Sequence, residues 1–203
     1  MKNNLPVFPL GLVALPGSIQ SLQIFEPRYL KMIKKCMSDN HGFVIVLKIS
    51  DTSEFGISKK GTYVEIIDFN NLPNGLLGIT VKSETKVSIN NICQLEDGLH
   101  IADIKPEIDP EVDNQALLAE YPEIISILSQ IIKHPKVNEL PIEVDFNSAD
   151  SVAYHLAGLI PLTSTQKQNL LEAFDASQRL LILSKYMSKF CVIDDLFHFR
   201  LFL

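Results

Sequence analysis

Glu26 and Arg28 are the charged side chains whose spacing most favours a recognition site in this sequence. They flank Pro27 and precede Tyr29, so a carboxylate and a guanidinium lie next to an aromatic ring. The same residues also suit a structural ion pair, because an acidic side chain is favoured where a helix begins. We favour the ion pair and keep Arg28 and Tyr29 as predicted partner-binding residues.

Residues that could support covalent or metal chemistry are present but badly spaced. The segment Gly56-Ile57-Ser58-Lys59-Lys60-Gly61 resembles a nucleophile elbow, yet it is one residue too long and has no predictable triad partners, so a surface loop is expected. No two histidines have metal-ligand spacing and no cysteine lies near another. We therefore expect no catalytic residue, no metal site and no cofactor.

Basic residues form a short stripe that could contact an acidic partner or RNA. Arg28, Lys31 and Lys35 are spaced to share one face of a helix, although a solvated face explains the same pattern. Residues 1–108 carry no net charge and residues 109–203 carry −6. Because nucleic-acid binding depends on neutralising phosphates, nucleic acid is not the expected partner. An RNA-binding module is kept as the alternative function.

The first half of the chain has the hydrophobic pattern of strands. In residues 5–29, two apolar runs are separated by a Pro16-Gly17 turn, and Pro27 suits the first position of a helix that extends to about Ser38. Further strands are predicted at residues 43–47, 62–69, 76–81, 86–89 and 99–104. Residues 43–47 are continuously apolar, which predicts a strand buried on both faces. Short strands with one helix favour a closed or half-closed β-barrel.

The second half has a helical pattern. Residues 103–123 are acidic and interrupted by prolines, which places a domain boundary near residue 108. Helices are predicted over residues 124–132, after Ser148, over residues 164–173 and after Asp175. Thr163 with Gln166, and Asp175 with Gln178, have the spacing of capping boxes. Four amphipathic helices of this length predict a small bundle.

Composition indicates an ordinary globular protein, with 46% hydrophobic and 21% charged residues. We see no signal peptide and no apolar run of membrane-spanning length. The three cysteines are odd in number and far apart, as expected for reduced, mostly buried thiols in the cytosol. A cytoplasmic protein without a membrane partner is the expectation.

Several motifs resemble those of the Lon N-terminal domain family, and they occur along the chain in the same order as in that family. They are the opening residues 5–29, Lys60-Gly61-Thr62 with residues 65–69, Leu72-Pro73-Asn74-Gly75, Leu159-Ile160-Pro161-Leu162-Thr163, residues 167–172 and Arg179-Leu180-Leu181. The resemblance implies an α+β protein with a PUA-like β-barrel domain at residues 1–108 and a C-terminal helical bundle at residues 109–203. In Lon proteases this domain precedes an ATPase module and a Ser-Lys protease domain, and it is associated with substrate recognition and hexamer assembly.

The resemblance implies binding rather than catalysis. The sequence contains no Gly-Lys dipeptide and hence no P-loop, so we expect a stand-alone, non-enzymatic Lon substrate-binding domain protein linked to protein quality control. Its expected partner is an unfolded polypeptide or a protease component, and a homo-oligomer is left open. The predicted contact residues, besides Arg28 and Tyr29, are Leu12, Leu15, Leu72 and Leu76. Binding is expected to use apolar side chains in a shallow groove, first of all one between the two halves, or strand addition at an open barrel edge.

Each apolar segment behind this prediction also fits a structural role. Residues 10–15 and the hairpin tip at residues 72–77 could equally belong to the core. The tail at residues 197–203 could pack on the bundle, close a dimer or be visible to proteases, and inward packing is our default.

Overall fold

The computed structural model describes residues 4–49, 54–138 and 141–189. The chain divides into two compact units, Met1–Ile108 and Asp109–Leu203, which are described separately below. The apolar tail predicted at residues 197–203 lies outside the described residues.

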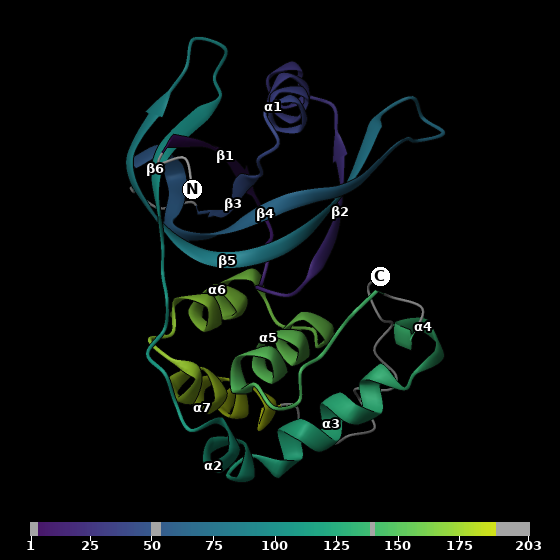
Figure 1. Ribbon diagram of the computed structural model, residues 1–203, viewed down its shortest axis with the longest axis vertical. Helices are drawn as coiled ribbons and strands as arrows, with labels where there is room; N and C mark the ends of the chain where they lie inside the picture. The colour runs from purple at the N-terminus through teal and green to yellow at the C-terminus, as the bar shows by residue number, and fades with distance from the viewer. Residues whose placement is uncertain (1–3, 50–53, 139–140, 190–203) are drawn as a thin grey trace. The chain divides into compact units, whose positions relative to one another are not determined.

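Strands dominate the first unit (Figure 1). Its elements are β1 (Asn4–Leu10), β2 (Ile19–Ile24), α1 (Pro27–Ser38), β3 (Phe43–Lys48), a 3-10 turn (Glu54–Gly56), β4 (Ile57–Asn71), β5 (Leu77–Gln94) and β6 (His100–Pro106). They form one six-stranded sheet in the order β2-β5-β4-β3-β1-β6. The described β1–β3 pair is parallel, and the other described pairs are antiparallel. This arrangement confirms the mixed α+β class.

The turn and helix start predicted in residues 5–29 are confirmed. Ser18 N–H donates to the Leu15 carbonyl at 3.0 Å, and Gly17 has a φ of 81°. A positive φ at the third turn position is what a type II turn requires, and glycine adopts it without a steric penalty. Pro27 then occupies the first turn of α1, where its missing N–H costs no hydrogen bond.

The strand β5 is longer than the sequence pattern predicts. The polar residues Lys82-Ser83-Glu84-Thr85 separate the two predicted strands at 76–81 and 86–89, yet the structure runs through them as one strand, Leu77–Gln94. Ser83 is buried, and its backbone is paired: its N–H donates to the Ser18 carbonyl and its carbonyl accepts from Gly17 N–H. Satisfied backbone groups therefore let a polar segment remain inside the sheet.

Pairing of β5 with both β4 and β6 closes a circuit of strands. The order β5-β4-β3-β1-β6 returns to β5, while β2 lies outside the circuit on the other part of β5. All five strands of the circuit contribute apolar side chains to one buried cluster: Leu5, Val7, Val44, Val46, Ile57, Tyr63, Val87, Ile89, Ala102 and Ile104.

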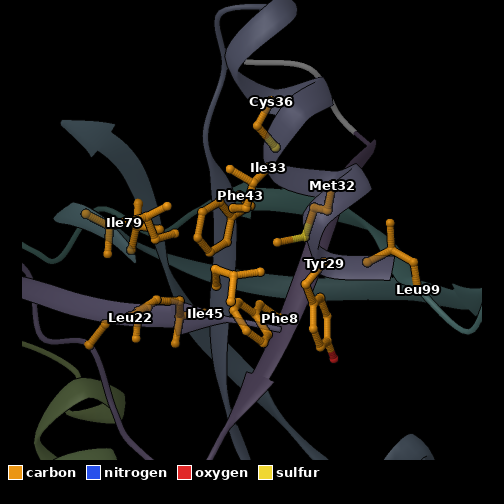
Figure 2. Packing of buried hydrophobic residues seen from close by; sticks show 14 residues of the cluster. Phe8, Leu22, Tyr29, Met32, Ile33, Cys36, Phe43, Ile45, Ile79 and Leu99 are labelled. Carbon is orange, nitrogen blue, oxygen red and sulfur yellow. The ribbon is translucent and has the colours of Figure 1, made fainter. Parts of the chain in front are cut away.

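The strand β3 is buried on both faces, as its apolar run predicts. Val44 and Val46 belong to the cluster shared by the circuit, whereas Phe43 and Ile45 point to the opposite face. There they meet the apolar side of α1, and the tilted rings of Phe8 and Tyr29 lie 4.0 Å apart between their centroids (Figure 2). Burial of this helix face fixes α1 on the sheet.

Tyr63 provides a buried hydrogen bond at the point where β3 begins. Its hydroxyl accepts from Gly42 N–H at 2.8 Å and lies 3.4 Å from a Glu65 carboxylate oxygen. Burial raises the pKa of Tyr63 above its usual value of 10.0, so the folded state favours the neutral phenol. The phenol is therefore a structural acceptor at neutral pH.

Replacing this hydroxyl by hydrogen tests the role of the bond. We expect Tyr63→Phe to lower the free energy of unfolding by about 1–3 kcal/mol at pH 7, because Gly42 N–H stays buried without its acceptor. As pH rises through the raised pKa, the wild type loses stability and the gap to Tyr63→Phe narrows. Because the loss begins only above the unfolded pKa of 10.0, urea unfolding at pH 7 and pH 11 measures both effects. A Tyr121→Phe control should change little, since no hydrogen bond of this hydroxyl is found among the described residues; an equal loss would contradict the assignment.

The second unit is helical in its described part (Figure 1). It contains α2 (Asn114–Ala119), α3 (Pro122–Ile132), α4 (Pro135–Asn138), α5 (Ala149–Leu159), α6 (Ser164–Glu172) and α7 (Ala176–Met187). The helix α5 contacts α2, α3, α6 and α7, and its residues 152–157 are all buried. The four predicted helices correspond to α3, α5, α6 and α7, and α2 and α4 are additional short helices.

One predicted capping box is complete and the other is partial. Thr163 and Gln166 satisfy each other's backbone N–H groups at the start of α6. Asp175 accepts from Gln178 N–H, but the Gln178 side chain accepts from Phe174 N–H, one residue before the expected position. Each helix start therefore has one first-turn N–H, that of Gln166 or of Gln178, paired with its N-cap side chain.

Arg179 of α7 is the largest completely buried polar side chain in the described second unit. It pairs with Asp109 at 2.6 Å and with Asp150, and its Nε donates to the Leu170 carbonyl at 3.0 Å. Its guanidinium also lies over the Tyr154 ring, 4.2 Å from the centroid. A buried cation needs such partners, because desolvation of an isolated charge is costly.

Other general expectations have mixed outcomes in the described residues. Cys36 is buried, but Cys93 is exposed on β5, so burial of the thiols was predicted correctly for only one of these two; Cys191 lies outside the described residues. Among residues 4–49, 54–138 and 141–189, none of the helices has the length and apolarity to cross a membrane. No group of three potential metal ligands comes together in those same ranges.

Candidate functional site

Five of the six predicted partner-binding residues fall into two groups, and the sixth, Arg28, is described below. Leu15 and Tyr29 are buried, and Leu12 is half-buried against the cluster beneath α1. Leu72 and Leu76 are half-buried at the tip of the β4–β5 hairpin, where Leu72 N–H donates to the Leu76 carbonyl. Tyr29 and Leu12 thus share one cluster, Leu15 is buried without belonging to it, and the two hairpin leucines keep exposed surface that a partner could contact.

Arg28 is held by structural contacts. Its Nη1 donates to the Gly98 carbonyl at 2.9 Å, and its Nη2 lies 2.7 Å from the Glu26 carboxylate. These bonds join the start of α1 to the β5–β6 turn. Burial, with a further contribution from the Arg28 charge, lowers the pKa of His100 below its usual value. The ion pair that the sequence predicted is therefore present.

The basic stripe on α1 is reduced by that ion pair. Lys31, Lys34 and Lys35 are exposed, whereas Arg28 is engaged with Glu26 and Gly98. Three exposed lysines on one helix are also what a solvated helix face contains. The stripe remains a prediction and does not define a site.

A more specific surface lies where β2, β5 and β4 extend together beyond the circuit of strands. Pairing of β3 with β4 reaches Val64, while β4 continues to Asn71 paired with β5 alone in the described residues. Figure 1 shows this hairpin projecting at the upper right, next to β2. We name residues 65–71 of β4 the free edge.

Large apolar side chains are exposed on this extension. Ile67 is 50% exposed and Phe69 is 57% exposed on the free edge, and Phe25 is 65% exposed directly after β2. Aromatic and β-branched residues of this exposure are what a partner surface offers. Tyr29 is buried and Arg28 is bonded to the Gly98 carbonyl, whereas the predicted Leu72 and Leu76 adjoin this surface at the hairpin tip.

Strand register explains why Phe69 is exposed. Leu22, Ile79 and Phe69 lie opposite one another across β2, β5 and β4, and opposite residues share a face. Leu22 and Ile79 are buried in the cluster beneath α1. Phe69 continues the same row of side chains onto the free edge, where it is not covered by that cluster and is exposed. A shift of register between Ile66 and Asp68 marks a bulge at Ile67.

Sequence reasoning missed Ile67 and Phe69 as surface residues. A signal was present, because Ile66, Ile67 and Phe69 cannot all lie on one face of a regular strand. Deciding which of them is exposed needs the end of β3 pairing at Val64, and that depends on tertiary structure.

Nearly the whole chain matches one known protein family. The family model for the ATP-dependent protease La (LON) substrate-binding domain matches residues 4–189 of the chain. This chain belongs to that family. The match covers both units, so the free edge and the Arg179 cluster are parts of a Lon substrate-binding domain.

Lon proteases are the curated relatives. The Heliobacterium modesticaldum Lon protease is 25% identical over 197 residues, covering 91% of this chain and 24% of the relative. Lon protease 1 of Bacillus subtilis is 26% identical over 191 residues, covering 89% of this chain and 24% of the relative. The chain thus matches about a quarter of the length of each protease.

Solved structures of Lon N-terminal domains share this fold. A Lon N-terminal domain protein from Xanthomonas campestris has a TM-score of 0.72 at 25% identity, covering 90% of this chain and 98% of that one. The N-terminal domain of the Mycobacterium avium complex Lon protease has a TM-score of 0.70 at 19% identity, covering 92% and 99%. The second likeness concerns the fold alone.

Proposed function

We propose that this chain is a non-enzymatic recognition module that binds unfolded polypeptide segments for a Lon-like proteolytic system, as part of protein quality control. The observation that carries the proposal is the exposure of Phe25, Ile67 and Phe69 on one extension of the sheet. Unfolded segments expose apolar side chains that such a surface buries, which provides a driving force for association. Membership of the Lon substrate-binding family supports the same class of ligand.

The proposed architecture has two domains. Residues 1–108 would form a PUA-like β-barrel, which the closed circuit of pairings and its shared apolar cluster support. Residues 109–203 would form a helical bundle, which the contacts of α5 with four other helices support. Leu72 and Leu76 are the predicted contact residues that adjoin the exposed surface, so we place binding on the first domain.

Binding to a permanently unfolded protein tests this function. Reduced, carboxymethylated α-lactalbumin is expected to bind the full chain with a Kd in the micromolar range, as for a small transient interface. Native α-lactalbumin should bind at least about tenfold more weakly, because its apolar side chains are buried. Biolayer interferometry with both forms measures the ratio.

Salt and substitution provide the controls. Raising salt from about 50 to 200 mM should change an apolar interaction little, whereas phosphate contacts lose affinity steeply. A Leu72→Ser/Leu76→Ser variant should bind several-fold more weakly, and Leu30→Ser/Leu95→Ser, at exposed leucines elsewhere in the first unit, should bind normally. Absence of binding to the unfolded form, with salt-sensitive binding to single-stranded RNA, would replace this proposal by the RNA alternative.

A further inference from the structure

We propose that the free edge, residues 65–71 of β4, binds an extended peptide of alternating apolar and basic residues as an added antiparallel strand. The inference rests on the proposed function and specifies its site, its ligand chemistry and its mode of binding. It differs from apolar contact alone, because backbone hydrogen bonds would supply part of the affinity.

The backbone of the free edge has the geometry for strand addition. Beyond Val64, the pairing of β4 in the described residues is with β5 on one side. In an antiparallel pair, every second residue directs its N–H and C=O away from the neighbouring strand. Residues 68–71, beyond the bulge at Ile67, therefore present outward N–H and C=O groups at every second residue, which is the pattern that another extended backbone matches.

The side chains of the free edge are more typical of a strand that binds a ligand than of an edge strand shielded against pairing. Edge strands are commonly shielded by lysine, proline, other charged residues or a bulge. Residues 65–71 contain no lysine or proline, and their shielding is limited to Glu65, Asp68 and the bulge at Ile67. They carry instead the half-exposed Ile67 and the more exposed Phe69. An apolar side chain of an added strand would cover Phe69 on the face that it shares with Ile79, as cross-strand pairs do within a sheet.

Charge decides between a basic peptide and a second copy of this chain. The charged residues of the free edge are Glu65 and Asp68. Glu65 lies opposite Lys82 in the sheet, but the residue directly opposite Asp68 is the uncharged Thr80. Two copies paired through this edge would bring acidic residues together, which is unfavourable, whereas a peptide lysine next to Asp68 would be favourable.

Asp68 also limits access to the backbone. Its carboxylate accepts a hydrogen bond from Phe69 N–H at 2.8 Å, so one donor of the edge is already satisfied within the chain. An added strand must replace this bond or pair on either side of it. Asp68→Asn removes the charge and leaves an oxygen that can accept the same bond, and it therefore separates the two roles of the residue.

Fluorescence anisotropy of the full chain with labelled heptapeptides tests the proposal. The probe alternates valine with lysine, and its two controls are the same peptide N-methylated at alternate amides and a peptide that alternates valine with glutamate. We expect each control peptide to bind at least about tenfold more weakly than the probe, through loss of backbone bonds or of charge complementarity. Asp68→Asn should weaken the probe and leave the glutamate peptide unchanged or tighter.

Paired variants locate the site. Ile67→Lys/Phe69→Lys should weaken the probe at least about tenfold. Leu30→Lys/Leu95→Lys adds the same charge at exposed leucines outside the free edge and should remain within about twofold of wild type. Urea unfolding of both variants establishes that each is folded.

Three outcomes would overturn the inference. The first is equal binding of the N-methylated peptide, which would show apolar contact without strand pairing. The second is a wild-type dimer in sedimentation velocity that Ile67→Lys/Phe69→Lys converts to monomer, which would assign the edge to a second copy. The third is full binding of unfolded α-lactalbumin by Ile67→Lys/Phe69→Lys, in which case the proposed function stands and its site lies elsewhere. If wild type binds neither unfolded protein nor probe, the proposed function itself fails.

Discussion

Replacing Asp109 and Asp150 together by alanine is expected to lower the free energy of unfolding by about 3–5 kcal/mol. Both carboxylates pair with Arg179, which is completely buried in the second unit. Their removal leaves a guanidinium without anionic partners, and the Leu170 carbonyl and the Tyr154 ring replace only part of its hydration. Arg179→Met should cost less, because the remaining carboxylates are partly exposed and can be hydrated.

Urea unfolding followed by helical circular dichroism measures this loss. The matched control is Glu111→Ala/Glu120→Ala, which removes two exposed acidic residues from the same unit and should leave the unfolding midpoint nearly unchanged. A loss of under about 1 kcal/mol in Asp109→Ala/Asp150→Ala would contradict the assignment of Arg179 as a buried cation that depends on these carboxylates.

The second large effect is expected for Gly42→Ala, with a loss of about 3 kcal/mol or more. A Cβ at this position would overlap the Val64 carbonyl oxygen and lie 2.9 Å from a Tyr63 ring carbon. The overlap is with backbone, so no rotamer change relieves it. Displacement of Gly42 would also lengthen its hydrogen bond to the Tyr63 hydroxyl and disturb the Phe43–Val64 register.

Thermal and urea unfolding of Gly42→Ala measure the effect, with Gly11→Ala as the matched control. Nothing lies within 4 Å of a Cβ built on Gly11, so the same chemical change should leave stability within about 0.5 kcal/mol of wild type. A Gly42→Ala variant as stable as wild type would show that β3 and β4 can separate at little cost.

Local features of the fold could be predicted because single residues determine them. Pro16-Gly17 predicted a turn, Pro27 predicted the first residue of α1, and Thr163 with Gln166 predicted a capping box, and the structure has all three. Each feature depends on φ preferences or on hydrogen bonds within four residues.

Pairings between distant residues could not be predicted in the same way. No local pattern specifies that β1 lies parallel to β3, or that Arg179 meets Asp109, seventy positions earlier in the sequence. The continuity of β5 through Lys82-Ser83-Glu84-Thr85 depends on backbone bonds from the turn at residues 17–18. Exposure of Phe69 follows from the end of β3 pairing, so the candidate site was predicted only at the hairpin tip.

The pairing of β1 with β6 has a consequence for biosynthesis. Asn4 lies opposite Asp103, so the first strand waits for a partner made almost a hundred residues later. At typical translation speeds that interval is about 5–20 s. During it, the apolar residues of β1 and β3 lack the strand that completes their sheet, and such late, non-local closure is slow in folding generally. The nascent chain would then expose the kind of apolar, extended segment that the finished domain is proposed to capture.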